Sequence, residues 1–521
     1  MRLLPAIMVA AFSGYIAISY EIIWLRTFSF AMESKADSFG LLLGAYLGGL
    51  AIGAHGAGLI CRSIAKTRVL MLLVGLLLAA NTAAFLVVPG MMACAEFCQN
   101  ERNMDLVLVA VATALLGMAL PVTAHAAVAP DKGAGRGISF IYCGNILGSV
   151  SGGLITGFWL FDVLNLTQNA FLLTLSGLVA TSLIVLTAQL SLTRRIQGLC
   201  GLAALAVLLA IATPELYAHA YSHLHYGNDY QRWGPLRSVI ESKSGVVALS
   251  RHGAIYSGGG YEGKFNVDPM PGKDRNRITR AFLTAAFHPD PKDILFIGLG
   301  SGSWAQVLAH HPDAARITIV EINPGFVRLA AKQPVVAGLL ENSKVEIIID
   351  DGRRFLRRTD RRFDLIVQNT IVFWRAHATN LLSREFLALT RSRLRPDGRL
   401  FINTTRSALA QKTVGAVFPH SMRYENMVIA GNGPIVIDRA RWRGKLLQWR
   451  INGKAVVPEH LRGVDLFNLL IKPTWREEPR WETGARMAAR TRDLPVITDD
   501  NMVTEFRPKV AFPATETKPS R

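Results

Sequence analysis

Long apolar runs fill the first 212 residues of the chain and are almost absent from the rest. Seven of these runs are long enough to cross roughly 30 Å of hydrocarbon as a helix, the last one only barely. They cover residues 4–25, 38–60, 69–90, 105–129, 138–160, 168–190 and 197–213. Because the runs have almost no polar face, which a water-soluble helix needs, they predict a polytopic α-helical membrane domain over residues 1–213.

Small residues recur within these runs, as at residues 44–49 and 144–157. Small side chains let membrane helices approach closely, so the runs indicate a helix bundle and a lipid bilayer as partner. One acid, Glu21, lies inside the first run, where it is either functional or placed near the interface with Arg26 as its partner. Six spans with a basic loop after the second also resemble, diffusely, half of a major-facilitator transporter.

Basic residues mark alternate loops, which predicts an orientation. They follow the second, fourth and sixth runs, whereas the loop at residues 161–169 has none. Because basic loops stay in the cytoplasm, the N-terminus is predicted to be cytoplasmic, in a bacterial inner membrane. Seven spans then place the chain after residue 213 outside the cytoplasm. The basic loop residues are Arg62, Lys66, Arg68, Lys132, Arg136, Arg194 and Arg195.

The pattern changes after residue 213. Residues 214–290 hold short alternating segments and a glycine cluster at 257–263, which predict a small β-rich lead-in with a hairpin or lid. From residue 293 apolar strands alternate with helical stretches, which predicts a doubly wound, Rossmann-like α/β domain over residues 291–440. The predicted strands are residues 294–297, 317–321, 345–349, 365–368 and 400–403.

Residues 441–521 are predicted to form a C-terminal extension. Its segment 441–450 mixes basic and aromatic residues and is interpreted as an edge strand with exposed charges, or else as a contact with lipid headgroups. Residues 509–521 are predicted to be a flexible tail.

The charge of the chain is concentrated in its second part. The whole chain carries +19, and residues 1–212 contain 11 Lys/Arg and 8 Asp/Glu, so residues 213–521 carry 19 − 3 = +16. This excess favours an anionic ligand or lipid headgroups, against the alternative of an ordinary solvated surface. Nucleic acid is not predicted, since the basic residues form no compact motif with interleaved aromatic residues.

The five cysteines predict no metal site, because none has the company of other zinc ligands. Cys94 and Cys98 share one loop and would form a disulfide if that loop is extracytoplasmic.

A glycine-rich turn follows the first predicted strand of the α/β domain. It contains Gly298, Gly300, Ser301 and Gly302 and leads into a helical stretch. Glycine lets the backbone approach a ligand closely, and the helix N-terminus leaves N–H groups free. Such a turn is a weak signal alone.

Acidic residues end the next two strands in the order that a nucleoside site requires. Glu321 ends the second strand, about twenty residues after the turn, where a carboxylate suits a ribose diol. Asp350 and Asp351 end the third, beside the expected position of an adenine. Three signals in the correct order predict a cofactor site of the nucleoside type.

These motifs resemble the polyamine aminopropyltransferases, the spermidine synthase family. The resemblance rests on the glycine turn, the V-E-I-N strand end at 320–323, D-D-G-x-x-F at 350–355, F-D-L-I-V at 363–367 and L-R-P-D-G at 394–398, and it covers residues 236–405. Membrane-fused members share a first span like S-Y-E-I-I-W-L-R and a late T-D-D-N segment, here residues 19–26 and 498–501. The resemblance implies that Glu321 holds the ribose and Asp351 the adenine of decarboxylated S-adenosylmethionine.

The sequence departs from the family at three acidic positions. Ser301 stands where the glycine loop has an Asp, and residues 369–373 stand where the catalytic loop reads D-S-S-D-P. Asn369 therefore takes the place of the acid that deprotonates the attacking amine, and Val372 that of an acid that holds a cationic amine. An amide cannot accept a proton at neutral pH, so the departures disfavour a polyamine substrate.

The rebuilt loop offers other chemistry. His377 is a candidate general base and Arg375 a candidate anion clamp, against the alternative that the loop is merely repacked. The leading hypothesis is a membrane-tethered transferase that uses S-adenosylmethionine or its decarboxylated form to move an aminopropyl or methyl group to a small-molecule substrate. The alternatives are a non-catalytic sensor on a membrane bundle and a transporter-like bundle with a regulatory domain. Homo-oligomerisation is left open.

Overall fold

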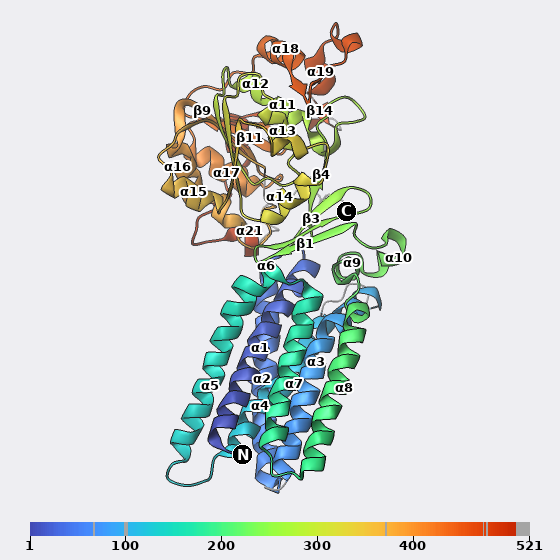
Figure 1. Cartoon of the computed structure of the whole chain (residues 1–521). Helices are drawn as coiled ribbons and strands as arrows, with labels where there is room; N and C mark the ends of the chain where they lie inside the picture. Colours follow the sequence, from blue (N-terminus) through green and yellow to red (C-terminus); the bar gives the residue numbers. More distant parts are fainter. Residues whose placement is uncertain (66–67, 98–102, 370–371, 472–473, 476–477, 507–521) are drawn as a thin grey trace. The chain divides into compact units, whose positions relative to one another are not determined.

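The computed structural model describes residues 1–65, 68–97, 103–369, 372–471, 474–475 and 478–506. The chain divides into two compact units, one of Met1–Glu33 and Asp37–Val246, the other of Ser34–Ala36 and Val247–Arg521. The first unit is mainly helical, and the second is built on a large β-sheet (Figure 1). Cys98 of the predicted disulfide and the predicted tail at 509–521 lie outside the described residues.

Long apolar helices make up most of the first unit. Among the described residues, seven helices are long and apolar enough to cross a membrane, judged by length and composition. They are α1 (Leu3–Ala31), α2 (Asp37–Ser63), α3 (Val69–Phe97), α4 (Asn103–Ala127), α5 (Ala134–Ile155) continued by a π-helical turn η2 (Thr156–Leu160) and α6 (Phe161–Val163), α7 (Leu166–Thr187) and α8 (Leu192–Leu216). All seven runs predicted from the sequence are therefore confirmed as helices.

Glycines allow two helix pairs of this unit to pack with their backbones in contact. A Cβ added at Gly152 of α5 would lie 2.6 Å from the carbonyl oxygen of Tyr15 on α1, and one at Gly144 would lie 2.9 Å from that of Ile7. Gly117 of α4 faces the backbone of Leu50 on α2 in the same way. The small residues therefore act as the bundle prediction requires.

The first unit ends in short elements after α8. They are α9 (Ala220–Tyr226), η3 (Gly227–Asp229), α10 (Tyr230–Trp233) and β1 (Ser238–Ser242). Residues 214–290, treated as one β-rich lead-in from the sequence, are thus helical at their start. Arg26 of α1 lies 3.6 Å from the carboxylate of Glu241 on β1, so Arg26 has a carboxylate partner other than the expected Glu21.

A β-hairpin introduces the second unit. Strand β2 (Gly245–Leu249) pairs antiparallel with β3 (Ala254–Ser257), and β3 pairs with β4 (Gly260–Lys264). Gly258 and Gly259 join β3 to β4 with φ of 49° and 81°, a conformation that favours glycine. The predicted hairpin at the glycine cluster is therefore confirmed.

The main sheet of the second unit has eight strands in the order β16-β10-β11-β9-β8-β5-β6-β7. Its parallel part is β5 (Asp293–Ile297), β6 (Arg316–Glu321), β7 (Val345–Ile349), β8 (Phe363–Gln368) and β9 (Leu394–Asn403). These strands contain all five predicted ones. The antiparallel edge consists of β10 (His420–Tyr424), β11 (Met427–Gly431) and β16 (Trp481–Thr483).

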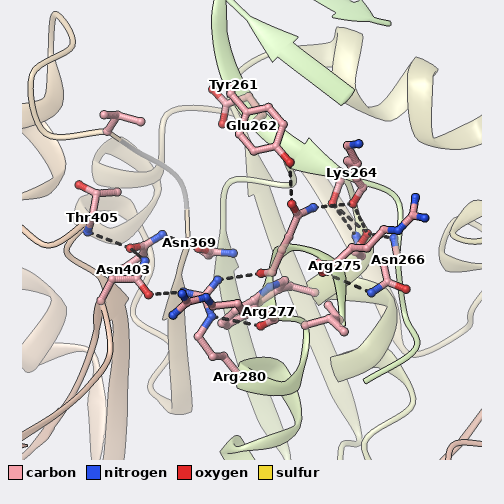
Figure 2. A pocket seen from close by; sticks show the side chains of 18 of the residues that line it. Tyr261, Glu262, Lys264, Asn266, Arg275, Arg277, Arg280, Asn369, Asn403 and Thr405 are labelled. Atoms are coloured by element: carbon pink, nitrogen blue, oxygen red, sulfur yellow. Dashed lines mark hydrogen bonds between the residues drawn. The ribbon is translucent and has the colours of Figure 1, made fainter. Parts of the chain in front are cut away.

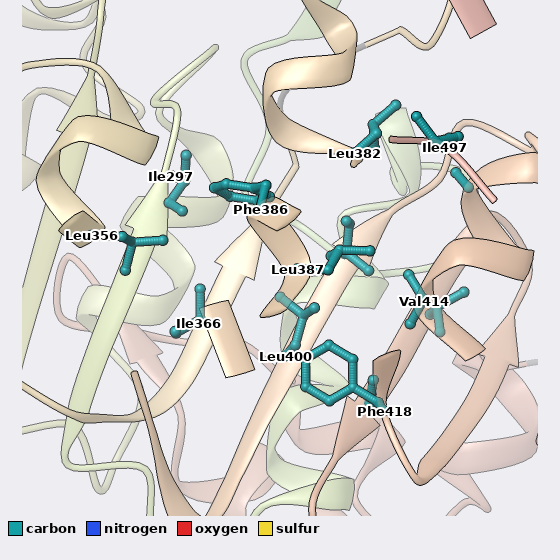
Figure 3. Packing of buried hydrophobic residues seen from close by; sticks show 14 of the residues in the cluster. Ile297, Leu356, Ile366, Leu382, Phe386, Leu387, Leu400, Val414, Phe418 and Ile497 are labelled. Carbon is teal, nitrogen blue, oxygen red and sulfur yellow. The ribbon is translucent and has the colours of Figure 1, made fainter. Parts of the chain in front are cut away.

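Helices pack on the sheet because alternate residues of each strand point to opposite faces. On one face, Leu400 belongs to a buried cluster with Phe386 of α16 and Val414 of α17 (Figure 3). Ile402 belongs to the same cluster. On β9, Phe401 lies between these two residues and contacts Phe287 and Trp304 instead. The helices are α11 (Thr279–Phe282), α12 (Thr284–Phe287), α13 (Ser303–Ala309), α14 (Pro324–Ala331), α15 (Gly352–Arg358), α16 (Arg384–Ser392), α17 (Ala408–Val417) and α20 (Gly484–Arg490).

The interpretation of residues 441–450 as an edge strand is wrong. Most of this segment belongs to helix α18 (Arg439–Gln448), which the side chain of Asp438 caps by accepting from the Arg441 N–H. Trp442 is buried and donates its indole N–H to the carbonyl oxygen of Phe282, 3.0 Å away. The helix therefore forms because a cap and a buried aromatic side chain fix it, and neither is visible in the mixed basic composition.

Candidate functional site

The glycine turn follows β5 at the carboxyl edge of the sheet. Gly298, Gly300 and Gly302 have φ of 80°, 54° and 73°, which side chains other than glycine rarely adopt. A Cβ added at Gly300 would meet no atom within 4 Å, so the space beside the turn is open. The turn therefore leaves room for a ligand to approach the backbone.

Glu321 stands at the end of β6 and holds this turn in place. Its carboxylate accepts from the Leu299 N–H at 2.6 Å and from the Asn323 N–H at 2.7 Å. Burial raises the pKa of the Glu321 carboxyl to about 7, although these N–H groups work in the opposite direction. The Gly300 N–H also lowers this pKa by hydrogen bonding, and because a carboxylate accepts about four hydrogen bonds, Glu321 remains able to accept from a ligand hydroxyl.

Asp350 and Asp351 lie at the neighbouring strand end, as predicted. The Asp350 N–H donates to the Glu321 carbonyl oxygen at 3.1 Å, so the two strand ends are joined. The Asp350 side chain pairs with Arg354, and one Asp351 oxygen caps helix α15 by accepting from the Arg354 N–H at 2.7 Å. Asp351 thus has one oxygen engaged in a helix cap and presents a partly exposed carboxylate at this edge.

The late T-D-D-N segment is anchored next to this edge. Arg353 of α15 donates to both carboxylate oxygens of Asp499, one of them at 2.8 Å, and the Asp499 N–H donates to Glu385 at 3.1 Å. A bidentate pair fixes direction as well as distance. The segment therefore holds helix α15 from the far end of the chain.

A cavity of about 370 Å³ opens beside the glycine turn (Figure 2). Its walls come from β4 and the segment that follows it, from the start of α13, and from the ends of β8 and β9. The lining residues are Tyr261, Glu262, Gly263, Lys264, Asn266, Arg275, Asn276, Arg277, Ile278, Arg280, Ser301, Ser303, Trp304, Asn369, Val372, Asn403, Thr405, Arg406 and Asn426.

Cations dominate the described wall of this cavity. Lys264, Arg275, Arg277, Arg280 and Arg406 line it, against a single carboxylate, Glu262. That carboxylate forms an ion pair with Arg375. Burial raises the pKa of Glu262, and the Arg375 guanidinium lowers it. The described lining therefore carries more positive than negative groups, although Arg277 is paired with Glu425 outside the lining.

A chain of amide side chains crosses the floor of the cavity. Arg280 donates to Asn426 Oδ1, Asn426 Nδ2 donates to Asn403 Oδ1 at 2.7 Å, and Asn403 Nδ2 donates to Asn369 Oδ1 at 2.8 Å. Guanidinium N–H groups can only donate, so the oxygen and nitrogen positions of each amide are fixed in turn. The backbone N–H of Thr405 also donates to Asn403 Oδ1, at 2.8 Å, which supports the same orientation.

Two segments of the cavity wall have left-handed backbone conformations. Asn276 and Arg277 have φ of 57° and 54°, and Thr405 and Arg406 have φ of 46° and 66°. Tyr261 helps to hold the first pair, since its hydroxyl donates to Asn276 Oδ1 at 2.6 Å. Such conformations cost free energy and cluster at binding sites, and both segments carry an arginine into the cavity wall.

The candidate catalytic residues are not all brought together. Asn369 lines the cavity, as does Val372, whereas Thr370 and Ile371 of the same loop lie outside the described residues. Arg375 is paired with Glu262 and does not line the cavity. His377 is exposed, and its backbone N–H donates to Glu505 at 2.9 Å.

Sequence reasoning missed the groups that give the cavity its character. Arg277 and Arg280 lie in the lead-in, in a stretch with basic residues at 273, 275, 277 and 280 that could have been noticed. Asn403 ends the last predicted strand, at the same edge as the predicted acids, and that position was a usable signal. Asn426 follows an antiparallel strand that the sequence analysis did not predict.

Comparison with known proteins identifies relatives of this chain. Residues 281–424 match the spermine/spermidine synthase domain. A polyamine aminopropyltransferase of Mycobacterium tuberculosis is 26% identical over 394 residues, covering 68% of this chain and 72% of the relative. Polyamine aminopropyltransferase 2 of Streptomyces coelicolor is 27% identical over 282 residues, covering 52% of this chain and 49% of the relative.

The match to the mycobacterial relative continues beyond the second unit. It spans 68% of 521 residues, or about 354, which exceeds the 275 residues from Val247 to Arg521. Among solved structures, a spermidine synthase in complex with a transition-state analogue is similar at 19% identity and a TM-score of 0.33, covering 52% of this chain and 87% of that chain.

Proposed function

Because the chain belongs to the spermidine synthase-like family, we propose that it is a membrane-integrated transferase of the aminopropyltransferase type. It binds an adenosyl cofactor, S-adenosylmethionine or its decarboxylated form, and moves an aminopropyl or methyl group to a small molecule. One observation carries the proposal. The glycine turn, Glu321 and Asp350 meet at one edge of the sheet, beside a cavity of about 370 Å³.

The residues at this edge fit an adenosyl nucleoside. The open space at Gly300 admits the ligand next to the backbone, and Glu321 accepts hydrogen bonds from the ribose hydroxyls. Asp351, which follows β7 and caps α15, binds the adenine. When bound, such a cofactor supplies an alkyl group activated by a sulfonium, and the protein holds and orients it.

The cavity beside this edge holds the acceptor. Asn369 and Asn403 stand at the ends of β8 and β9, so an acceptor bound there faces a group carried over the glycine turn. Positioning alone accelerates a transfer reaction by holding the reacting atoms together. Glu262 is the one carboxylate of the described lining, and it is engaged in an ion pair with Arg375.

A second candidate function is a non-catalytic binding module. The observation in its favour is that Asn369 presents an amide where the family resemblance implies a proton-accepting acid. Binding of a nucleoside without turnover by any acceptor is the result that would favour this candidate.

The first unit serves as the membrane anchor in this proposal. Its outer surface is apolar, with Ile52, Met71, Leu147 and Ile211 between 62% and 76% exposed. Lipid would cover these side chains, because a continuous apolar surface is unfavourable in water. The basic loops favour a cytoplasmic N-terminus, and with seven spans this proposal has the second unit on the opposite side of the membrane.

Calorimetry with the purified full-length protein in a neutral detergent tests the cofactor. S-adenosylmethionine, its decarboxylated form and methylthioadenosine are titrated separately. We expect binding of at least one, and the preferred sulfonium identifies methyl or aminopropyl as the transferred group. Absence of binding by all three to folded protein would refute the cofactor site.

Reporter fusions test the orientation. Fusions after Arg195 and after Thr213 flank most of α8 and are expected to report opposite sides of the membrane. If both report the cytoplasm, α8 does not cross, and the second unit shares the compartment of the ordinary cofactor supply.

A further inference from the structure

We propose that the cavity recognises an anionic group, a carboxylate or phosphate on the acceptor, and excludes polyamines. This inference rests on the proposed function for the ligand's role as acceptor, whereas the recognition itself rests on the cavity walls. Five cations and one carboxylate line the described part of the cavity, and that carboxylate is engaged by Arg375. A polyamine, which carries several positive charges, would be repelled.

Arg280 is the centre of the recognition site. Its side chain is buried, and three of its five N–H groups donate to the Arg277 carbonyl oxygen at 3.1 Å, the Asn276 carbonyl oxygen at 2.8 Å and Asn426 Oδ1. The other two have no acceptor among the described residues. The guanidinium also lies 5.6 Å from the centre of the Trp304 ring. It is therefore held rigidly with donors to spare.

The surroundings leave the charge of Arg280 incompletely compensated. No described carboxylate lies within ion-pair distance of its guanidinium, since Glu425 pairs instead with Arg277 at 2.6 Å and Arg480 at 2.9 Å. Burial lowers the pKa of Arg280 to about 10, although the carboxylates of Glu425 and Asp274, which act on it from beyond ion-pair distance, raise it. An anion in the cavity would supply the missing compensation.

Asn369 adds a second donor at a defined place. Its Oδ1 accepts from Asn403, so its NH₂ group is the part left for a ligand. The orientation follows from Arg280 through the amide chain and therefore does not depend on a choice between two equivalent flips. Arg280 and Asn369 thus offer the acceptor donors from two walls, as Figure 2 shows.

Lys264 places a further charge on the wall formed by β4. No described carboxylate lies within ion-pair distance of it, and its carbonyl oxygen accepts from Asn276 Nδ2 at 3.0 Å. Strand β4 is thereby tied to the left-handed segment that carries Arg277. Lys264, Arg277 and Arg280 therefore belong to one connected wall.

Titration of the full-length protein in a neutral detergent, at constant ionic strength, tests the inference. The probes are inorganic phosphate, succinate and putrescine, each with and without saturating S-adenosylmethionine. We expect phosphate or succinate to bind and putrescine not to bind, and the preferred anion identifies the phosphate or carboxylate class. Binding of putrescine at least as tight as both anions would overturn the inference.

Variants locate the binding. Asn369→Asp replaces a donor by a negative charge. It is expected to weaken binding of the preferred anion by roughly 10- to 150-fold, which corresponds to the loss of a hydrogen bond to a charged group. Arg280→Met is expected to do at least as much. Because Arg280 is buried and this variant is at risk of misfolding, Lys264→Gln provides a further test, with a smaller expected loss.

Arg251→Gln is the matched control, since Arg251 is an exposed cation of the same unit outside the cavity. It should leave anion affinity unchanged. Equal affinities in the control, Lys264→Gln and Asn369→Asp proteins would overturn the inference. If anions bind but no adenosyl nucleoside does, the inference on recognition stands and the cofactor proposal fails. If an adenosyl nucleoside binds but no anion does, the inference on recognition fails and the cofactor proposal stands.

Discussion

Two neighbouring regions at the carboxyl edge of one sheet differ in their chemistry. At the ends of β6 and β7, Glu321, Asp350 and Asp351 form an acidic edge beside the glycine turn. At the ends of β8 and β9, Asn369 and Asn403 form an amide floor under a cationic wall. The acidic edge has the carboxylates that the family resemblance implies, whereas the cavity lacks the acids that it implies there.

The difference indicates which function each region serves. A ribose offers hydroxyl donors, and the acidic edge provides acceptors for them. The cavity provides donors and positive charge, which match an acceptor with an anionic group. Under the proposed function, the acidic edge serves a nucleoside and the cavity serves an acceptor of opposite charge to a polyamine, and the two differ only in the residues at strand ends.

The largest effect is expected for spermidine formation. Wild-type protein given putrescine and decarboxylated S-adenosylmethionine should be a poor catalyst, because Asn369 cannot accept a proton. Asn369→Asp should raise the rate, by at most the ~10²–10⁴-fold that a general base contributes. Mass spectrometry of the product measures this, with His377→Ala as an unaffected control. Robust wild-type activity would contradict the prediction and direct attention to Glu262, the carboxylate in the described wall.

Substitutions in the two regions should have different effects on cofactor affinity. Glu321→Ala is expected to weaken the preferred adenosyl nucleoside by roughly 10- to 150-fold, since a hydrogen bond to a charged group contributes ~1.5–3 kcal/mol. Asn369→Ala should leave this affinity nearly unchanged, because Asn369 faces the acceptor. Calorimetry measures both. A similar loss in the two variants would mean that the cavity and the acidic edge bind the same part of one ligand.

The acidic edge should also show a pH dependence. Burial raises the pKa of Glu321 to about 7, so between about pH 4.5 and 7 the folded state holds a proton that the unfolded state has lost. The contribution of Glu321 to stability therefore falls as pH rises through this window. Nucleoside affinity should rise over the same window, by up to about tenfold per pH unit, because the carboxylate is the better acceptor.

Calorimetry and thermal melting between pH 5.5 and 8.5 test both trends, with Glu321→Gln as the control that does not titrate. The prediction fails if the wild-type and Glu321→Gln proteins have parallel pH profiles.

The smallest effect is expected at the anchor of helix α15. Asp499→Asn weakens the bidentate pair with Arg353, which is partly exposed, so the loss of stability should be at most about 1 kcal/mol. Nucleoside affinity should fall less than it does in Glu321→Ala. Glu459→Gln, which breaks an exposed pair with Arg462, is the control. An affinity loss as large as that of Glu321→Ala would place the T-D-D-N segment in the ligand site.

The acidic edge could be predicted from the sequence because its residues are fixed by local order. A strand, a glycine turn and a following acid define their positions within about thirty residues, and the parallel strands β5 to β9 lie where apolar runs predicted them. The helices of the first unit were predictable for the same reason, since length and apolar composition are local properties.

The cavity could not be predicted because its groups are joined across the chain. Arg280 and Asn426 are 146 positions apart, and their contact depends on the antiparallel edge strands. No local sequence pattern predicted these strands. Arg375 and His377 follow Asn369 closely in sequence, yet Arg375 pairs with Glu262 and His377 is exposed. Distance along the chain was a poor guide to distance in space.

The amide chain has an evolutionary consequence. Since Arg280 and Asn369 are joined through two further amides, the two positions should show epistasis, although they lie far apart in sequence. An acid at position 369 would appear in a cavity whose donors remain oriented for an anion, whereas loss of the guanidinium would let Asn426 turn over while the Thr405 N–H still orients Asn403. The order in which such substitutions arise would then decide whether each intermediate protein binds any acceptor.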